Sequence, residues 1–446
     1  MDNIETYDLI LKNGRVVLPN YNIEELDIGI IDSKIQFIGQ LKSTKAKNII
    51  DLKNLHVLPG CIDTQVHFRE PGLTHKEDLE SGTLGAVLGG ITGIFEMPNT
   101  SPPTITKNDF EFKVKLGLKK SYCDFGFFIG AAEENINELI HLEKLSGCCG
   151  IKIFMGSSTG SLLVEDDKNI EDILSKSTRT IAVHSEDELR LRERKNIIED
   201  KDVNVKDHEI WRDAETALRS TKRLLKIATK VGRSIHILHI STADELKIIK
   251  NNKSFVTAEA TPQHLFFNSP ECYEKLGSLV QMNPPIRGKI HQDALWNAIK
   301  NKVIDIIGSD HAPHTLEEKK RPYPKSPSGM IGVQTLVPIM LNFVNNGKLS
   351  IKDFVRLTSF NPAKIFKIKN KGSLSIGFDA DFTVVDLNKS RIIENSWIAS
   401  KSGWTPYNGL KVKGWPVYTI IRGKIIMRED KVIDKPQGQK ICFLDT

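Results

Sequence analysis

The spacing of hydrophobic and polar residues changes twice along the chain. Residues 1–55 contain short alternating segments, such as YDLILKNGRVV and KIQFIGQL, with Asn-Gly and Asp-Ser turns between them, which predicts β-strands. In residues 56–368, short apolar runs alternate with longer amphipathic stretches, which indicates repeated βα units. In residues 369–446 the strand pattern returns, as in KGSLSIGFDADFTVVDL. We therefore expect a β-rich segment at each end and an α/β segment between them.

The middle segment contains eight apolar runs of strand length: HVLPGCIDTQVHF, TGIFEMPN, CDFGFFIG, GIKIFMG, TIAVHSE, SIHILHIS, SFVTAEATP and VIDIIGSDH. The stretches between them have helical periodicity. In DAETALRSTKRLLKIATKVG, for example, Leu224 and Ala228 share an apolar stripe and Gly232 is placed to end the helix. Eight strands with helices between them predict an α/β fold, with residues 56–368 as a (β/α)₈ TIM barrel. Residues 1–55 and 369–446 are predicted to pack together as one small β-sandwich.

Composition places the chain among soluble globular proteins. Of its 446 residues, 39% are hydrophobic and 26% are charged, and a disordered or membrane protein would depart from these values. The first residues, MDNIETYDLI, lack the basic and apolar regions of a signal peptide, and no apolar run approaches the roughly 18 residues of a transmembrane helix. Six scattered cysteines without a CxxC pair predict free thiols. We expect a cytoplasmic protein that does not contact a membrane.

The net charge of +6 raises the question of nucleic acid binding. The lysines and arginines are spread along the chain and mixed with acidic residues, and neither a basic tract nor a nucleic acid-binding motif is present. We therefore expect no nucleic acid partner. A mildly basic surface is compatible with a small anionic substrate.

Polar residues recur at the points where the apolar runs of the middle segment end. The C-terminal ends of the strands of a (β/α)₈ barrel meet on one rim, where catalytic groups lie. Each residue alone has a structural explanation, such as a buried histidine with a hydrogen-bond partner. Their combined presence on one rim favours a functional site. The residues at these ends are His67, Asn99, Lys152, His184, His239 and Asp310.

This set of side chains suits a divalent metal ion. Imidazole nitrogens and carboxylate oxygens are ligands that Zn²⁺ prefers. Lys152 is the exception, because an ammonium group repels a cation. If CO₂ has carboxylated Lys152, the amine becomes a carboxylate able to bridge two metal ions. The metal would then activate a water molecule and Asp310 would move its proton, which is the chemistry of a hydrolase.

Eight motifs in order now support a family resemblance: HFREPG, MPNT, KIFM, VHSE, HILHIS, TPQHL, NPPIR and GSDHAPH. In their order and spacing they closely resemble the dihydroorotases of the amidohydrolase superfamily. The resemblance covers nearly the whole chain, including GFDADFTVVDL near the end. It implies a reversible cyclisation of N-carbamoyl-L-aspartate to L-dihydroorotate, a step of pyrimidine (UMP) synthesis.

The resemblance also implies a set of site residues. Its metal ligands, for one or two zinc ions, fall on His67, Lys152 (as N6-carboxylysine), His184, His239 and Asp310, and Asp310 would also be the catalytic proton carrier. Its substrate contacts fall on Arg69, Asn99, Asn283, His314 and the backbone of Gly329. A guanidinium group such as that of Arg69 can bind the carboxylate of dihydroorotate as a fork.

One residue departs from the family pattern. The first histidine of the HxH motif is replaced by Gln65, whose neutral amide oxygen is a much poorer zinc ligand than imidazole. Lys152, His184 and His239 are all retained. We therefore expect an active enzyme in which the first metal ion is weakly bound or absent, while the second supplies the activated water.

Two other functions are compatible with these residues. A related cyclic amidohydrolase, such as a hydantoinase, dihydropyrimidinase or allantoinase, shares the metal ligands but does not need Arg69, Asn99 and His314 to bind a carboxylate. An inactive homologue that serves as a partner of aspartate transcarbamoylase would explain Gln65, although it would not need to keep the other ligands. The resemblance is also compatible with a homodimer.

The remaining histidines and one arginine are interpreted as structural. His236 precedes His239 by three residues, and alternation along a strand predicts that it faces the helices. His264 and Arg287 lie in family-like motifs and are expected to support the framework. The histidines expected at the surface are His56, His75, His141, His208 and His291.

Overall fold

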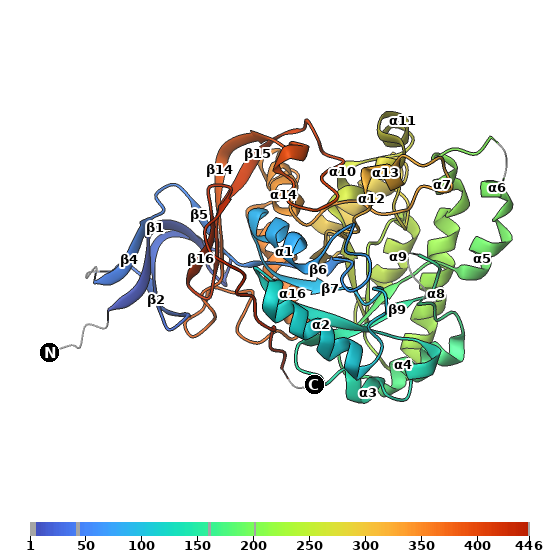
Figure 1. Ribbon diagram of the computed structural model, residues 1–446, viewed down its shortest axis with the longest axis horizontal. Helices are drawn as coiled ribbons and strands as arrows, with labels where there is room; N and C mark the ends of the chain where they lie inside the picture. Colours follow the sequence, from blue (N-terminus) through green and yellow to red (C-terminus); the bar gives the residue numbers. More distant parts are fainter. Residues whose placement is uncertain (1–5, 42–44, 159–161, 200–201, 445–446) are drawn as a thin grey trace.

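The computed structural model describes residues 6–41, 45–158, 162–199 and 202–444. A barrel of parallel strands with surrounding helices lies beside a largely antiparallel sheet built from both ends of the chain (Figure 1). Among the described residues, no helix combines the length and apolar character that crossing a membrane requires.

The predicted (β/α)₈ barrel is confirmed. Its eight strands follow one another in chain order around the sheet, and each pair is parallel. A parallel bridge between Val66 and His311 brings the first strand next to the end of the last. The strands are β6 (Cys61–Val66), β7 (Ile91–Glu96), β8 (Asp124–Gly130), β9 (Cys148–Phe154), β10 (Ile181–His184), β11 (Ile235–Ile237), β12 (Val256–Ala260) and β13 (Ile306–Ile307).

The helices between the strands cover the outside of the barrel. The predicted helix in residues 213–232 is α8 (Ala214–Val231), in which Asp213 caps the first turn and Gly232 ends the helix with a left-handed φ of 67°. The other long helices are α1 (Leu79–Leu88), α2 (Lys107–Lys120), α4 (Asp167–Lys176), α9 (Ala243–Asn251), α12 (Lys289–Lys300) and α14 (Leu336–Asn345). Shorter ones are α3 (Leu139–Leu142), α5 (Glu188–Glu193), α6 (Asn196–Glu199), α7 (Asp207–Trp211), α10 (Pro262–Phe266), α11 (Glu271–Leu276), α13 (Leu316–Lys319), α15 (Ile351–Val355) and α16 (Asn361–Ile365).

Both ends of the chain form one nine-stranded sheet, as the sequence predicts for their association. Strand β5 joins the two halves, because it pairs in parallel with β1 and antiparallel with β14, and Gly60 then leads directly into β6. The strands are β1 (Tyr7–Val17), β2 (Ile23–Ile31), β3 (Lys34–Gly39), β4 (Ala46–Asp51), β5 (His56–Pro59), β14 (Phe382–Ile392), β15 (Lys411–Ile421), β16 (Lys424–Arg428) and β17 (Lys431–Val432).

A buried ion cluster fastens the sheet to the barrel. The Lys371 Nζ atom lies 2.8 Å from Asp124 Oδ2, at the start of β8, and 3.0 Å from Asp379 Oδ2, and it also donates to Asp381. Arg422 donates to Asp124 as well, and its backbone N–H donates to Asp381 Oδ1 at 2.7 Å. Although burial opposes the charged form, the Asp381, Asp124 and Asp379 carboxylates raise the pKa of Lys371 above its ordinary value. This cluster explains the Asp-Ala-Asp run of the GFDADF motif.

Replacing Lys371 by methionine is expected to destabilise the protein. The variant would leave three carboxylates close together without their shared cation, and breaking a buried ion pair costs about 3–5 kcal/mol. Urea unfolding followed by circular dichroism should show a clear loss of the free energy of unfolding. As a control, Lys47→Met removes the exposed pair with Asp8 and should leave the urea midpoint unchanged. Equal stability of the two variants would contradict a role of the cluster in joining the sheet to the barrel.

Candidate metal and substrate site

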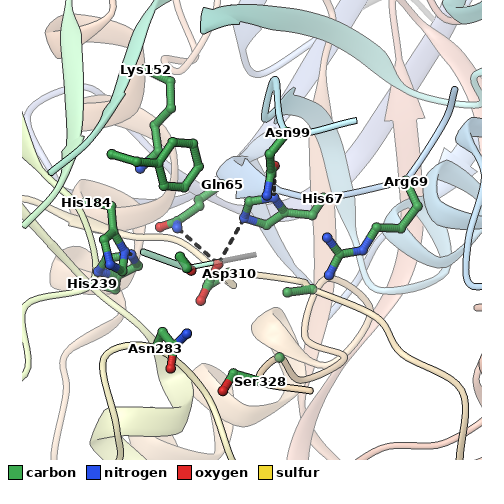
Figure 2. Close-up of a pocket in the computed structure, with 14 residues that line it drawn as sticks. Gln65, His67, Arg69, Asn99, Lys152, His184, His239, Asn283, Asp310 and Ser328 are labelled. Atoms are coloured by element: carbon green, nitrogen blue, oxygen red, sulfur yellow. Dashed lines mark hydrogen bonds and ion pairs between the residues drawn. The ribbon is translucent and has the colours of Figure 1, made fainter. Parts of the chain in front are cut away.

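A pocket at the C-terminal rim of the barrel gathers nearly all the predicted site residues (Figure 2). It encloses about 360 Å³, including its open mouth. His314 is the one predicted residue that does not line it, and its Nε2 atom lies 3.3 Å from the Nη2 atom of Arg69, which does. The lining residues are Gln65, His67, Arg69, Asn99, Lys152, Phe154, Ser158, His184, His239, Asn283, Asp310, Ala312, Ser328 and Gly329.

The strand ends and the loops after them aim these side chains inward. Ile151 and Ile153 of β9 pack in the core between strands and helices, so Lys152 between them faces the mouth of the barrel. Three residues of the site have left-handed backbones, Arg69 (φ 60°), His239 (φ 36°) and Asp310 (φ 45°). Such conformations are costly for residues other than glycine and cluster at functional sites, because the surrounding fold must hold them.

His67 and Asp310 form the first pair of candidate metal ligands. His67 Nδ1 lies 2.7 Å from Asn99 Oδ1, and an amide oxygen only accepts, so this nitrogen carries the proton. The other nitrogen, Nε2, therefore presents its lone pair to Asp310 Oδ1 at 3.3 Å. Burial also lowers the pKa of His67. A lone pair facing a carboxylate oxygen is a place for a cation.

His184 and His239 form the second pair. The His184 Nε2 atom lies 3.0 Å from Glu186 Oε2. Although burial opposes the charged form, the Arg212 guanidinium and His184 hold the pKa of Glu186 at about 2. The ionised carboxylate therefore accepts a hydrogen bond from the Nε2–H group of His184, and the lone pair of His184 Nδ1 faces His239 Nε2 at 3.0 Å. Histidine ligands of metal ions commonly have such a carboxylate partner, which orients the ring.

Lys152 lies close enough to both pairs for its charge to act on them. It is 1% exposed, and its Nζ atom has no hydrogen-bond partner among the described residues. Burial lowers its pKa to about 7, although the Asp310 and Glu259 carboxylates oppose the shift. Its charge in turn contributes to the lowered pKa values of His184 and His239. Near neutral pH a substantial fraction of Lys152 would therefore be uncharged.

The donor set fits a divalent metal ion once Lys152 is included. Within the described part of the chain, no three His, Cys, Asp or Glu side chains form a metal-binding group by themselves. The pocket instead contains the two pairs above, and a lysine bearing a carboxylate would add the third ligand to each. Gln65 lies beside the first pair, where its Nε2 atom donates to Asp310 Oδ1 at 3.0 Å and its Oε1 atom, although buried, has no hydrogen-bond partner.

Arg69 approaches the pocket from the side opposite His184 and His239 (Figure 2). It is 1% exposed and forms no ion pair with the described residues; its Nε atom donates to Pro313 O at 3.2 Å, and its Nη1 atom has no partner. Burial lowers its pKa to about 10, still far above neutral pH, so the guanidinium is charged. A buried charged fork with a free donor is suited to binding an anion.

Asn283 and the loop with Ser328 and Gly329 form the remaining wall of the pocket. A histidine that the sequence analysis assigned to the surface supports this wall: His208 is buried, and its Nε2 atom lies 2.9 Å from Asn283 Oδ1 and 3.0 Å from Met282 O. The prediction was wrong because the short helix α7 packs against the pocket wall, which the local pattern does not reveal. The surface prediction also fails for His56, which is buried in β5.

The predicted orientation of His236 was also wrong. Its neighbours Ile235 and Ile237 pack in the outer core, so His236 faces the barrel interior, where its ring lies 5.6 Å from that of Phe366. Strand β11 ends at Ile237, and His239 has a left-handed backbone, so strand alternation does not extend from one histidine to the other.

Sequence comparison identifies the family. The family model described as the amidohydrolase family matches residues 56–426. The chain belongs to the amidohydrolase family. The relatives of this amidohydrolase include a dihydroorotase from Pyrococcus abyssi, 39% identical, with 97% of this chain and 96% of the relative covered. A dihydroorotase from Methanosarcina acetivorans is 35% identical, with 96% and 94% covered. Membership of the family and these relatives imply metal dependence.

Solved structures agree with this family and fold. The L-hydantoinase (dihydropyrimidinase) from Arthrobacter aurescens has a TM-score of 0.93 and 29% identity, with 98% of this chain and all (100%) of that chain covered. The dihydropyrimidinase from Brevibacillus agri has a TM-score of 0.90 and 26% identity, with 98% and 99% covered. The amidohydrolase therefore shares its barrel and sheet with enzymes named for other cyclic substrates, and the pocket residues must distinguish among them.

Replacing Glu186 by glutamine is expected to weaken binding of a divalent metal ion. The neutral amide keeps the shape but no longer holds the His184 proton on Nε2 as strongly, and loss of such a partner costs about tenfold to a hundredfold in metal affinity. Competition with a chromophoric chelator measures the affinity. Glu245→Gln is a matched control, because Glu245 is also buried but bonds to Thr242 and Thr221 instead of a histidine. Equal metal affinity in both variants would contradict the role of Glu186.

Proposed function

We propose that this amidohydrolase is a dihydroorotase, which interconverts N-carbamoyl-L-aspartate and L-dihydroorotate. The observation that supports the proposal most directly is Arg69, a fully buried guanidinium with no ion-pair partner among the described residues and a free Nη1 donor. Dihydroorotate carries a carboxylate that can complete this fork. The cyclic amides dihydrouracil and hydantoin have no carboxylate. A pocket built for them would leave a buried charge unpaired, which is costly.

Each part of the proposed reaction has a candidate group in the pocket. In ring opening, water adds to the ring carbonyl carbon, the bond from that carbon to the ring nitrogen breaks, and the nitrogen gains a proton. Asp310 lies at the pocket and can take the proton from water and deliver it to the leaving nitrogen. Arg69 would hold the substrate carboxylate, and Asn283 with the loop at Ser328 and Gly329 would hold the polar edge of the ring. Ring closure uses the same groups in reverse.

The proposed metal ligands are His67, Lys152, Asp310, His184 and His239, with zinc as the ion. When bound, zinc supplies Lewis acidity for the ring carbonyl and lowers the pKa of a water molecule. His184 Nδ1 and His239 Nε2 lie 3.0 Å apart, so the two imidazoles could hold one ion between them, and nitrogen ligands of this kind suit zinc. The low pKa of Lys152 supports carboxylation, because CO₂ reacts with the uncharged amine.

Gln65 is proposed to weaken the first of two metal sites. Its amide donates to the Asp310 oxygen that faces His67, so it competes for an electron pair that a metal ion would use. The pair of His184 and His239 has no such competitor among the described residues. One firmly held zinc ion beside Lys152 is therefore sufficient for activity in this proposal.

A substrate panel tests the proposed function. Purified, zinc-loaded protein should convert dihydroorotate much faster than dihydrouracil, hydantoin or allantoin. Arg69→Met should lower the catalytic efficiency with dihydroorotate by about a hundredfold or more, because a charge-assisted bidentate contact is lost. Arg194→Met is a control, since that arginine lies outside the pocket and bonds to the backbone of Trp211 and Ile210. Turnover of dihydrouracil in preference to dihydroorotate would show a dihydropyrimidinase, and no turnover at all would favour the inactive homologue.

Replacing Gln65 by histidine should raise the metal content. Imidazole would add a strong nitrogen ligand beside His67 and remove the amide bond to Asp310. Metal analysis after gel filtration should give close to one zinc ion per chain for the native protein and a second for the variant. Gln65→Leu is the control, since it removes the same amide bond without adding a ligand, and it should not gain the second ion. Two zinc ions in the native protein would refute the proposed effect of Gln65.

A further inference from the structure

Lys76 lies beside the proposed carboxylate site but does not line the pocket. It belongs to the loop between β6 and α1 and is 9% exposed. Its Nζ atom lies 3.0 Å from His314 Nδ1 and 3.0 Å from Glu318 Oε1. Ser402 fixes the backbone of the loop by donating to Lys76 O at 2.8 Å. The lysine is therefore held between a carboxylate and a ring nitrogen.

These contacts determine which nitrogen of His314 carries the proton. An ammonium group only donates, so His314 Nδ1 must accept from Lys76 and cannot carry a proton. The remaining proton is on Nε2, which lies 3.1 Å from the backbone oxygen of Ser328 and can donate to it. Burial, with the charges of Arg69, Lys76 and Lys319, lowers the pKa of His314 well below its ordinary value, so the ring is neutral.

The position of that proton decides whether Arg69 can donate a hydrogen bond to His314. The Arg69 Nη2 atom is 3.3 Å from His314 Nε2, but two N–H groups cannot hydrogen bond to one another. His314 in this form therefore leaves Nη2 without an acceptor, and Nη1 has none either. While His314 Nε2 donates to Ser328 O, the two terminal nitrogens of Arg69 remain available as a pair of donors at one place. Such a pair matches the oxygen atoms of a carboxylate.

We propose that Lys76 is a positioning residue that fixes the tautomer of His314 and thereby keeps the Arg69 fork open for the substrate carboxylate. The inference rests on the proposed function and extends it to substrate selection. Lys76 acts through His314 and does not touch the substrate. Its effect should therefore be confined to substrates that carry a carboxylate.

Removing the ammonium group frees the other tautomer. In Lys76→Met, His314 Nδ1 can carry the proton and turn it toward Glu318, whose Oε2 atom is 3.8 Å away. His314 Nε2 then accepts from Arg69 Nη2, and half of the fork is occupied before the substrate arrives. A hydrogen bond to a charged group is worth roughly a tenfold to hundredfold change in binding, and KM for dihydroorotate should rise by about this factor while kcat changes little.

The kinetic experiment compares three variants of the zinc-loaded enzyme. Lys76→Met should raise KM for dihydroorotate and leave the slow turnover of dihydrouracil, which has no carboxylate, unchanged. Lys76→Arg should restore a KM close to the native value, because arginine also only donates. Lys401→Met is the matched control, since Lys401 contacts the same loop at Thr74 O and Asp78 but not His314. Its KM should equal that of the native enzyme.

Nitrogen-15 NMR of histidine-labelled protein reads the tautomer directly. The His314 signals, assigned by their loss in His314→Gln, should show the proton on Nε2 in the native protein and in Lys76→Arg, and on Nδ1 in Lys76→Met. The double variant Lys76→Met/Glu318→Gln removes the carboxylate whose negative charge could favour a protonated His314 ring. It should show a neutral ring and the same high KM.

Two results would overturn the proposal: an unchanged His314 tautomer in Lys76→Met, or an equal loss with dihydrouracil and dihydroorotate, which would indicate a merely structural role. A different result is expected if the proposed function itself is wrong. In that case the native protein does not convert dihydroorotate, while the NMR comparison still tests whether Lys76 sets the tautomer.

Discussion

The site depends on one constraint, the burial of two side chains that are positively charged in water. Lys152 and Arg69 are almost fully buried, and neither forms an ion pair with the residues that the structure describes. Burial of such groups is costly unless they lose their charge or another molecule offsets the cost of desolvation. CO₂ can do so at Lys152 by converting the amine into an anion, and a substrate carboxylate can do so at Arg69. In the proposed function, the two ends of the pocket would hold different anions: a carboxylate formed covalently on Lys152 at one end, and a substrate carboxylate exchanged in every catalytic cycle at the other.

The architecture follows from local patterns, because each element has a strong periodic signal. Eight apolar runs became eight parallel strands, and Gly232 ends α8 as expected. The structure also brings His67, Lys152, His184, His239 and Asp310 to one pocket. That result follows from parallel topology alone, since strand ends that share a polarity meet on the same rim.

The local sequence pattern does not reveal contacts between segments that lie far apart along the chain. His208 looked like a surface residue because its helix is short and polar, yet it packs against Asn283. Lys76 lies in a loop without periodicity, and its partner His314 is far along the chain. His236 was placed on the wrong side because the length of a strand was overestimated by two residues. Glu186, in contrast, stood in the VHSE motif directly after a strand, and its role beside His184 could have been anticipated from the preference of metal-binding histidines for carboxylate partners.

Strand β5 has a consequence for the synthesis of the protein. Its four residues pair with β14, while Gly60 N donates to Asp381 O, Cys61 N donates to Thr383 Oγ1 and Ser359 Oγ donates to Pro59 O. The start of β6, the strand that leads to Gln65 and His67, is thus held in place by residues about 300 positions later in the chain. Contacts so distant along the chain form late. A nascent chain that has emerged only through its first barrel strands can pair β6 with β7 but lacks the residues that bond to β5 and to the start of β6. The pocket is therefore completed only when nearly all of the polypeptide is available.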